Sequence, residues 1–250
     1  MVQELKGRGY DNVKLVSRGV AIELFKPNRR SSALRESWGV LPDDPVVILV
    51  GRLAKEKNVG LVVSAFRAIQ AKQPRAKLVF VGDGPLRKTL EEMCPDAHFA
   101  GIRKGEDLAA HYASGDLFLF PSLTETFGNV VPEALASGLA VVSYANAAAQ
   151  ELIIQNHNGI LVPNGDELGF VNASVEMAMD LTRRQHMREA APRSVAFLAW
   201  AAVCESFEEV LRDVLARHGQ QFGAVDSAPL GYSRVPAQER LAHPHVSPLR

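Results

Sequence analysis

Short apolar runs alternate along this chain with longer segments in which apolar residues recur at a helical period. The runs are apolar throughout, which is typical of strands covered on both faces of a sheet. Strands are therefore expected at Val13–Val16, Val46–Val50, Leu78–Val81, Leu117–Phe120, Ala140–Tyr144 and Ile160–Val162, with a shorter one around His98–Ala100.

Five segments between these runs are suited to helices: Gly60–Ala71, Gly84–Met93, Glu106–Ala113, Val130–Ser137 and Asn146–Gln155. In the first of them Leu61, Ala65 and Ile69 fall on one helical face. The alternation of strands and helices predicts an α/β fold with a doubly wound, parallel, Rossmann-like sheet. Ligands of such sheets bind at the carboxyl ends of the strands, so the loops that follow the strands are expected to carry the chemistry.

A long helical region follows the last strand, and the pattern changes near residue 220. Apolar residues from Trp200 to Val214 keep the helical i, i+3, i+4, i+7 spacing. From Gln220 onward the period is lost, and Pro229, Pro236, Pro244 and Pro248 interrupt the chain. We interpret residues 220–250 as a flexible tail with little influence on chemistry.

The composition argues against several classes of protein. Lys plus Arg and Asp plus Glu both number 28 among 250 residues, so no net charge attracts nucleic acid. Cys94 and Cys204 are too few for a disulfide framework and lie in no metal-binding pattern, which favours a reducing compartment. The first ten residues are polar and charged, unlike a signal peptide, and no apolar run is long enough to span a bilayer. We expect a cytoplasmic protein.

The segment Glu125–Thr–Phe–Gly–Asn–Val–Val–Pro–Glu133 carries the most informative chemistry in the chain. It follows a strand candidate, so its Gly128 turn is expected at the ligand edge of the sheet. Backbone N–H groups at the start of the following helix favour an anion such as a diphosphate. Glu133 lies about one turn into that helix, where its carboxylate can accept hydrogen bonds from the diol of a ribose. A sugar nucleotide carries a diphosphate, a ribose and a hexose together.

Further motifs precede this segment in order: Gly51–Arg52–Leu53 with Glu56–Lys57–Asn58, then Val81–Gly82–Asp83–Gly84–Pro85, then Pro121–Ser122. Their order and spacing resemble those of retaining, family 4-like glycosyltransferases of the glycosyltransferase-B fold. The likeness runs from about Leu15 to about Leu215, and four motifs in order make a chance match improbable. The resemblance implies the second half of that fold, the carboxyl-terminal domain that binds the nucleotide sugar.

The resemblance also implies roles for individual residues. Arg52 and Lys57 match the pair that binds the donor diphosphate, and Glu125 matches a residue beside the donor sugar; these three form the predicted catalytic set. The nucleotide base is expected near Ile102–Arg103. The predicted donor-binding residues are Gly51, Arg52, Lys57, Gly82, Ile102, Arg103, Glu125, Phe127, Gly128, Asn129, Val130 and Glu133.

Simpler structural explanations exist for several of these residues. Arg52 and Lys57, taken alone, are explained as solvated loop charges, and Glu133 as a residue that complements the helix dipole. Core packing explains Phe127 equally well. For Asp83 we favour a cap on the following helix over a ligand contact.

No metal and no cofactor are expected. The chain contains no Asp-x-Asp motif, and fixed cations with N–H donors suffice to stabilise charge on a departing phosphate. Retaining members of the resembled family are discussed as reacting on one face of the sugar, with the acceptor hydroxyl assisted by the leaving phosphate. No general base is then required from this half.

The start of the chain resembles the segment that crosses between the two domains of this family, through Val13–Lys–Leu–Val–Ser–Arg–Gly–Val20 and Phe25–Lys–Pro27. We divide the chain into a crossover segment (residues 1–25), a donor-binding domain (26–219) and the tail. The first domain, which holds the acceptor site in this family, is not among these residues. The expected partners are a nucleotide-sugar donor and a lipid or glycan acceptor bound through that domain. Peripheral membrane association through that domain is also expected, as is self-association through uncovered apolar surface.

The predicted function is retaining transfer of a hexose from a nucleotide-diphosphate sugar to a lipid or glycan hydroxyl. The sequences of two segments resemble those of bacterial hexosyltransferases: Gly128–Asn–Val–Val–Pro–Glu133 and Tyr144–Ala–Asn–Ala–Ala–Ala149. Among these enzymes, mannosyltransferases that use GDP-mannose are our first choice. The alternative is a non-catalytic sugar-nucleotide-binding fragment that lacks its acceptor domain. A sugar-nucleotide epimerase on the same two-domain fold is a weaker third option. The sequence leaves the sugar and the base open.

Overall fold

The computed structural model describes residues 2–125 and 127–219, and the predicted tail lies outside these ranges. The chain divides into two compact units, one ending at Phe207 and one beginning at Glu208. Of the second unit, only the end of helix α10 (Trp200–Gly219) is described. The sheet and the candidate site belong to the first unit.

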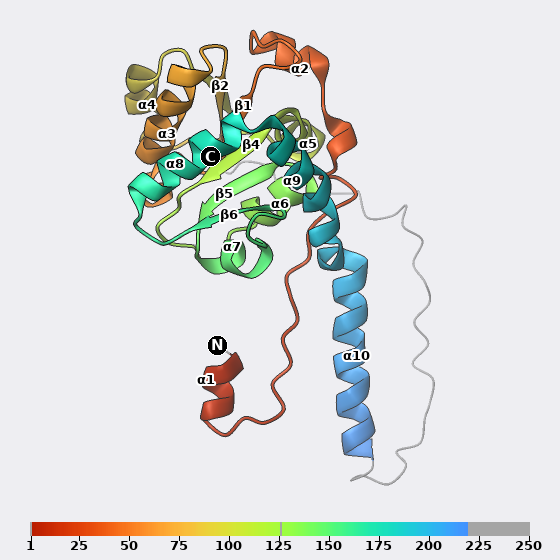
Figure 1. Cartoon of the computed structure of the whole chain (residues 1–250). Coiled ribbons are helices and arrows are strands. Elements are labelled where there is room, and N and C mark those ends of the chain that lie inside the picture. Colours follow the sequence, from red (N-terminus) through yellow and green to blue (C-terminus); the bar gives the residue numbers. More distant parts are fainter. Residues whose placement is uncertain (1, 126, 220–250) are drawn as a thin grey trace, which may run out of the picture. The chain divides into compact units, whose positions relative to one another are not determined.

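The first unit is built on a six-stranded sheet (Figure 1). Its strands are β1 (Val46–Val50), β2 (Lys77–Val81), β3 (His98–Gly101), β4 (Leu117–Phe120), β5 (Ala140–Tyr144) and β6 (Gly159–Val162). All pairings are parallel, in the order β3-β2-β1-β4-β5-β6. The order changes direction between β1 and β4, as in a doubly wound Rossmann-like sheet, so the predicted fold class is confirmed.

Helices precede, connect and follow the strands. They are α1 (Val2–Gly7), α2 (Ser32–Ser37), α3 (Val59–Lys72), α4 (Arg87–Met93), α5 (Gly105–Ser114), α6 (Val130–Ala136), α7 (Ala147–Leu152), α8 (Glu167–Met179) and α9 (Leu181–Ser194). Short 3-10 turns lie at η1 (Pro27–Arg29), η2 (Lys55–Lys57) and η3 (Ala196–Leu198).

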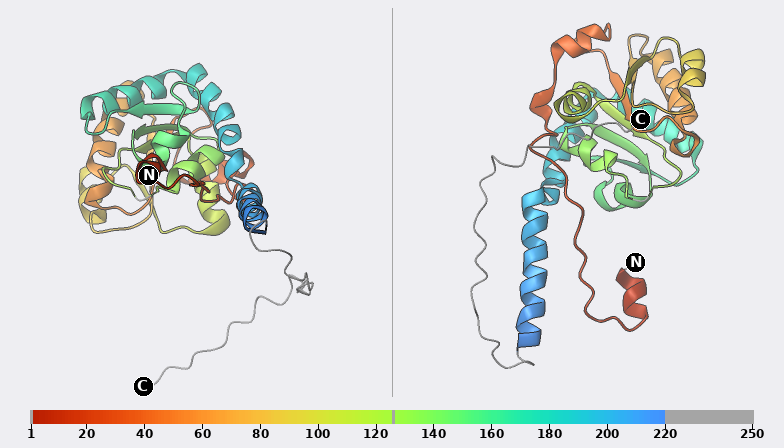
Figure 2. Two further views of the ribbon diagram at one scale, coloured as in Figure 1. Left: turned by 90° about the horizontal axis from the view of Figure 1, so that it is seen from below. Right: turned by 180° about the vertical axis from the view of Figure 1, so that it is seen from behind.

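Side chains that alternate along each strand pack against different helical layers, which lie on both sides of the sheet (Figure 2). In β1, Val46, Ile48 and Val50 belong to the core cluster that includes α5 and α6. Val47 and Leu49 belong to the cluster that includes α3, α4 and α8. All five residues of β1 are buried. Burial on both faces explains why the strands read as unbroken apolar runs in the sequence.

One predicted strand is wrong. Residues 13–16 belong to an irregular segment before the sheet, and Leu15 is 59% exposed. A short apolar run becomes a strand only where a neighbouring strand accepts and donates its backbone hydrogen bonds. No described strand lies beside this run. The other strand predictions are confirmed, with ends shifted by at most one residue.

The five helices predicted between strands are present, but two are shorter than expected by at least three residues. Helix α4 begins only at Arg87, because the residues before it form a turn in which the Leu86 N–H donates to the Leu53 carbonyl (2.9 Å). Helix α7 already ends at Leu152, whose carbonyl accepts a hydrogen bond from the Asn158 side chain (2.9 Å). Both differences arise from contacts with residues outside the helix itself.

The long helical region after the last strand is divided into α8, α9 and α10. Asp180 separates the first two, and its carboxylate accepts a hydrogen bond from the Arg183 N–H at the start of α9 (2.9 Å). Within the described ranges, none of the helices combines the length and the apolar character that a membrane span requires.

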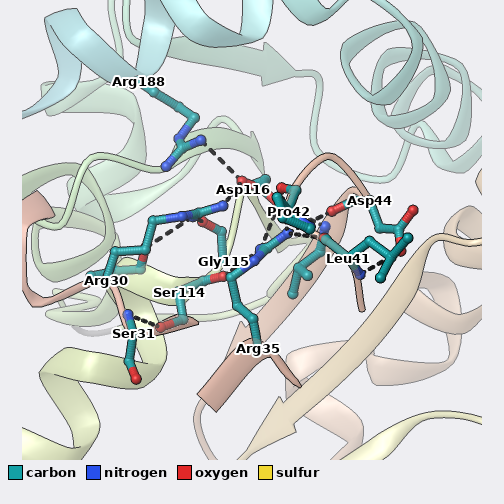
Figure 3. A network of polar contacts seen from close by, with 12 residues as sticks. Arg30, Ser31, Arg35, Leu41, Pro42, Asp44, Ser114, Gly115, Asp116 and Arg188 are labelled. Atoms are coloured by element: carbon teal, nitrogen blue, oxygen red, sulfur yellow. Dashed lines mark hydrogen bonds and ion pairs between the residues drawn. The ribbon is translucent and has the colours of Figure 1, made fainter. Parts of the chain in front are cut away.

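A buried polar cluster ties the segments around β4 together (Figure 3). The Asp116 carboxylate accepts hydrogen bonds from Arg30 (2.8 Å), Arg35 (3.1 Å), Arg188 (2.9 Å) and the Val46 N–H (2.9 Å). Burial raises the pKa of Asp116, but the three guanidinium charges outweigh it and hold this pKa below its usual value. The cluster lies at the amino ends of β1 and β4, so it stabilises the fold at the edge opposite to the expected ligand.

Candidate active site

The candidate site lies where the loops after β1 and β4 diverge. The helices that follow these neighbouring strands pack on opposite faces of the sheet, which leaves a crevice at the carboxyl ends. A cavity of about 330 Å³ occupies this crevice. It is lined by Arg18, Val50, Gly51, Arg52, Lys57, Phe120, Glu125, Phe127, Gly128, Asn129 and Val130.

A second cavity of about 300 Å³ lies at the ends of β1, β2 and β3. Its lining is Val50, Gly51, Arg52, Val81, Gly82, Asp83, Ile102, Arg103 and Leu108. Residues 50–52 line both cavities. The two are therefore neighbouring parts of one cleft along the carboxyl edge of the sheet.

The loops after β1 and β2 approach each other so closely that position 82 requires glycine. Gly82 has a φ of 136°, and a Cβ built there would lie 1.9 Å from the Gly51 carbonyl oxygen. The Gly51 N–H donates to Val81 (2.9 Å) and the Gly82 N–H donates to Gly101 (2.8 Å). Because both amides are used within the fold, the two glycines contribute the shape of the cleft wall.

Lys57 and Glu125 form an ion pair inside the larger cavity. The Lys57 ammonium donates to Glu125 Oε1, and Ser122 Oγ donates to the same oxygen (3.0 Å). The two charged side chains are 18% and 10% exposed, and the ammonium also lies 5.5 Å from the Phe120 ring centroid. These contacts fix the position of Glu125 and neutralise one cation of the cleft.

The two arginines that follow β1 and β3 differ in their contacts. Arg103 donates to the Ala100 carbonyl (2.9 Å) and pairs with Asp107 (3.1 Å), so its guanidinium is largely committed. Arg52 is exposed, lines both cavities, and has no side-chain hydrogen bond or ion pair to any described residue. Its guanidinium is therefore available to an anion in the cleft.

The turn between β4 and α6 presents backbone and side-chain groups to the larger cavity. Gly128 has a φ of 84°, a conformation that favours glycine. Pro132 has no N–H, Val131 donates to Gly128 (3.0 Å), and Glu133 donates to Asn129 (3.1 Å). The N–H groups that remain candidates for a ligand are those of residues 128–130. Asn129 Oδ1 is buried and has no hydrogen-bond partner among the described residues, so it is an available acceptor.

Glu133 lies behind this turn and is held by Tyr112. The Tyr112 hydroxyl donates to Glu133 Oε2 (3.0 Å). Burial raises the pKa of Glu133 above its usual value, while the Tyr112 hydrogen bond and the charge of Arg18 act in the opposite direction. Burial, with the nearby Glu133 charge, also raises the pKa of Tyr112 well above normal, so its hydroxyl keeps its proton. The result is a half-buried carboxylate with one oxygen oriented by a fixed donor.

The structure brings the predicted site residues to one edge of the sheet. The larger cavity is lined by Gly51, Arg52, Lys57, Glu125, Phe127, Gly128, Asn129 and Val130, and the smaller one also by Gly82, Ile102 and Arg103. Glu133 lines neither cavity. Proximity alone does not test the role of any of them, so their assignments to donor binding and catalysis stay predictions.

Sequence reasoning missed two residues and misjudged a third. Arg18 lines the larger cavity from the segment before the sheet, where the only signal was a lone cation next to Gly19. Tyr112 reaches Glu133 from α5, a contact without local signal. The expected cap by Asp83 is wrong: its carboxylate accepts from the Gly84 N–H (2.7 Å), and α4 starts without a side-chain cap.

Metal-binding groups are not gathered in the described part of the chain. Within residues 2–125 and 127–219, no three His, Cys, Asp or Glu side chains are close enough together to hold an ion. Both cysteines are free, and burial raises the pKa of Cys94 to about 11, so this thiol stays protonated at neutral pH.

The sheet order and its cleft define a Rossmann-like domain of the glycosyltransferase-B type, which solved structures support. Sucrose-phosphate synthase from Thermosynechococcus elongatus is 25% identical and aligns over 86% of this chain and 57% of its own, with a TM-score of 0.70. Anabaena HepE, solved in complex with UDP, has a TM-score of 0.71 at 24% identity over 80% of this chain and 57% of its own.

Sequence comparison gives the family. Residues 44–180 match the glycosyl transferases group 1 family, and the chain belongs to it. Over 86% of this chain, it is 37% identical to a GDP-mannose-dependent alpha-mannosyltransferase of Corynebacterium glutamicum, and the match covers 51% of that protein. The protein of the same name from Mycobacterium tuberculosis is 37% identical over 82% of this chain and 52% of its own. The chain thus spans about half the length of these relatives.

Proposed function

We propose that this chain binds a nucleoside-diphosphate sugar and supplies the donor site of a retaining hexosyltransferase. The observation that carries the proposal is the cleft at the point where the strand order changes direction, with Arg52 and Lys57 on one wall and the turn before α6 on the other. Guanidinium and ammonium groups are strong phosphate ligands. The similarity to proteins named GDP-mannose-dependent alpha-mannosyltransferases supports GDP-mannose as the donor.

Glu133 is proposed to accept hydrogen bonds from the ribose hydroxyls. Its Oε2 is oriented by Tyr112 (3.0 Å), which leaves Oε1 as an acceptor for a diol. A hydrogen bond to a charged group contributes roughly 1.5–3 kcal/mol, whereas a dipole effect contributes about 1 kcal/mol or less. Because Tyr112 fixes the orientation of the Glu133 carboxylate, we favour binding of the ribose over a simple interaction with the helix dipole.

Glu125 and Asn129 are proposed to position the donor hexose. Both line the larger cavity, and the unpartnered Asn129 Oδ1 accepts a hydrogen bond from a sugar hydroxyl. Glu125 is held by Lys57 and Ser122, so its carboxylate orients a hydroxyl without needing to move. In this assignment Glu125 lies beside the sugar and forms no covalent bond to it.

The proposed bond cleavage separates the anomeric carbon from the diphosphate. Negative charge then grows on the leaving oxygen while the sugar gains oxocarbenium character. Fixed cations lower the barrier when they lie where that charge develops, because they need no rearrangement during the reaction. Arg52 and Lys57 are proposed for this role, with no metal required. The acceptor hydroxyl attacks the same face and passes its proton to the leaving phosphate, so the configuration is retained.

An acceptor domain is proposed to complete the enzyme, because the chain spans about half of its named relatives. Without that domain the cleft lacks the closure that excludes water from the reacting bond. These residues alone are then expected to bind donor with negligible transfer. Binding without any catalytic function remains the second candidate for this chain.

Calorimetric titration of the chain with GDP-mannose, GDP, UDP-glucose, UDP-N-acetylglucosamine and ADP-glucose tests the proposal. The expected result is binding of GDP-mannose and GDP in preference to the other donors, unchanged by EDTA. Failure to bind any of these nucleotides overturns the donor-site assignment. Binding that disappears with EDTA and returns with Mg²⁺ or Mn²⁺ overturns the metal-free account.

Transfer is measured separately with radiolabelled donor and mixed lipid and glycan acceptors, alongside light scattering. Efficient turnover by a monodisperse monomer would place the acceptor site within this chain. Donor binding without turnover agrees with the requirement for an acceptor domain. Adding that domain from a mannosyltransferase relative separates the two candidates, since only a competent donor half is expected to gain activity.

A further inference from the structure

We infer that Arg18 is a third cation on the donor diphosphate, supplied by the segment before the sheet; the inference rests on the function proposed above. Arg18 lines the same cavity as Arg52 and Lys57, although it belongs to an irregular segment that precedes every strand. Its side chain makes no hydrogen bond or ion pair with the described residues. A guanidinium in such a position is free to form a bidentate contact with phosphate oxygens.

The charges that line the cavity show why a further cation is needed. The diphosphate of a nucleotide sugar is doubly negative at neutral pH. Lys57 is already paired with Glu125, so together they contribute no net charge. Arg52 contributes a single positive charge to the cavity lining, and Arg18 contributes a second. The net charge of the lining then balances the doubly negative diphosphate. Charge balance matters in a partly shielded cleft, where uncompensated charge is costly.

The chain immediately after Arg18 is fixed to the body of the first unit. The Val20 N–H donates to the Leu198 carbonyl (2.7 Å). At position 19 the backbone lies against Trp200, since a Cβ built on Gly19 would be 2.4 Å from the indole ring. Residues 19 and 20 are both buried. This attachment holds the base of the Arg18 side chain at the rim of the cleft while its guanidinium stays exposed.

Arg18 also acts electrostatically on Glu133, the proposed ribose ligand. A guanidinium that serves only this carboxylate would affect nucleoside and nucleotide binding alike. One that contacts the diphosphate would affect nucleotide binding far more. The two roles therefore differ in which ligand loses affinity.

The test compares Arg18→Gln with the unchanged chain, using calorimetric titration with GDP and displacement of GDP by guanosine. Arg8→Gln is the matched control, because Arg8 is an exposed arginine of the same amino-terminal segment that pairs with Glu4 and lines neither cavity. We expect Arg18→Gln to weaken GDP roughly tenfold or more and guanosine less than about threefold, with Arg8→Gln changing neither. Arg18→Lys is expected to restore part of the GDP affinity.

The outcomes distinguish failure of the Arg18 inference from failure of the proposed donor-binding function. Equal losses for GDP and guanosine would mean that Arg18 acts through Glu133, and unchanged GDP affinity would mean that it has no ligand role; either result overturns the inference. If the unchanged chain binds neither GDP nor GDP-mannose, the proposed function itself fails. Circular dichroism of each variant verifies the fold, and exposure of the Arg18 side chain makes misfolding an unexpected result.

Discussion

The hydroxyl of Tyr112 donates to the carboxylate of Glu133 across 3.0 Å, joining the carboxyl-terminal half of α5 to the first turn of α6. The hydrogen bond orients the Glu133 carboxylate and stabilises its ionised form, whereas burial favours its protonated form. Tyr112→Phe keeps the aromatic packing and removes this donor. We expect donor affinity to fall several-fold, less than for Glu133→Ala, measured by calorimetric titration with GDP-mannose. Equal losses in the two variants would mean that Tyr112 itself contacts the ligand.

Replacing Glu133 with Gln is expected to separate stability from donor binding. The folded-state pKa of Glu133 is raised, so its ionised form costs stability as pH rises through that pKa, and the uncharged amide avoids this cost. The amide oxygen would still accept from Tyr112, so urea unfolding at pH 7 should give equal or greater stability. Donor binding should weaken by roughly 1.5–3 kcal/mol, because the charged acceptor is lost. Loss of both properties together would identify Glu133 as a structural residue.

The donor affinity should depend on pH through Glu133. Because the pKa of Glu133 is raised, protonation on acidification begins above the ordinary Glu range near about 4.3, and binding should weaken as the proton is taken up. GDP-mannose is the suitable probe, since it lacks the terminal phosphate that titrates near about pH 6 in GDP. The dependence should be absent in Glu133→Gln. An identical pH profile in that variant would assign the effect to another group.

Glu125→Gln tests whether Glu125 contacts the hexose while Lys57 contacts the diphosphate. Removing the carboxylate charge releases the Lys57 ammonium, which is then free to contact the diphosphate. Affinity for GDP should therefore stay equal or rise several-fold. The affinity of GDP-mannose relative to that of GDP should decrease, because the contact with the hexose is weakened. Lys57→Gln is the paired control and should weaken both ligands. A similar loss of GDP affinity in both variants would contradict the proposed division of roles.

Asp116→Asn should be the most destabilising of these substitutions. It removes the carboxylate shared by Arg30, Arg35 and Arg188 in a buried setting, where breaking such a network costs about 3–5 kcal/mol. Urea denaturation measures the loss. The control is Asp96→Asn, because Asp96 pairs with Arg67 but is 42% exposed, and such an exposed pair is expected to contribute about 1 kcal/mol or less.

The stability that Asp116 provides should also depend on pH. Its pKa is lowered in the folded state, so the contribution is fully present above the unfolded-state pKa and is lost as pH falls through the folded-state value. The difference in unfolding free energy between the unchanged chain and Asp116→Asn should therefore shrink in acid. A difference that stays constant down to low pH would show that the carboxylate charge is not what stabilises the cluster.

Much of the fold was predictable from local patterns. Strands buried on both faces appear as continuous apolar runs, so β1, β4 and β5 were located to the residue. The failure at residues 13–16 has a physical cause: a strand depends on a partner, and the apolar character of a run does not reveal whether one is present. Likewise the late start of α4 depends on a hydrogen bond to Leu53, more than thirty residues earlier in the chain.

The sequence by itself determined the class of sheet and which loops gather at its carboxyl edge, because strand and helix periodicity follow from local burial. Its motifs, through their resemblance to the glycosyltransferase family and their positions after strands, also marked Arg52, Lys57, Glu125 and Glu133 as candidates. The tertiary structure decided how these charges are shared: Lys57 with Glu125, Glu133 with Tyr112, and Arg18 brought to the cleft from outside the sheet. Such pairings depend on distances between residues far apart in the chain, and electrostatic interactions follow distance and burial, which no local pattern encodes.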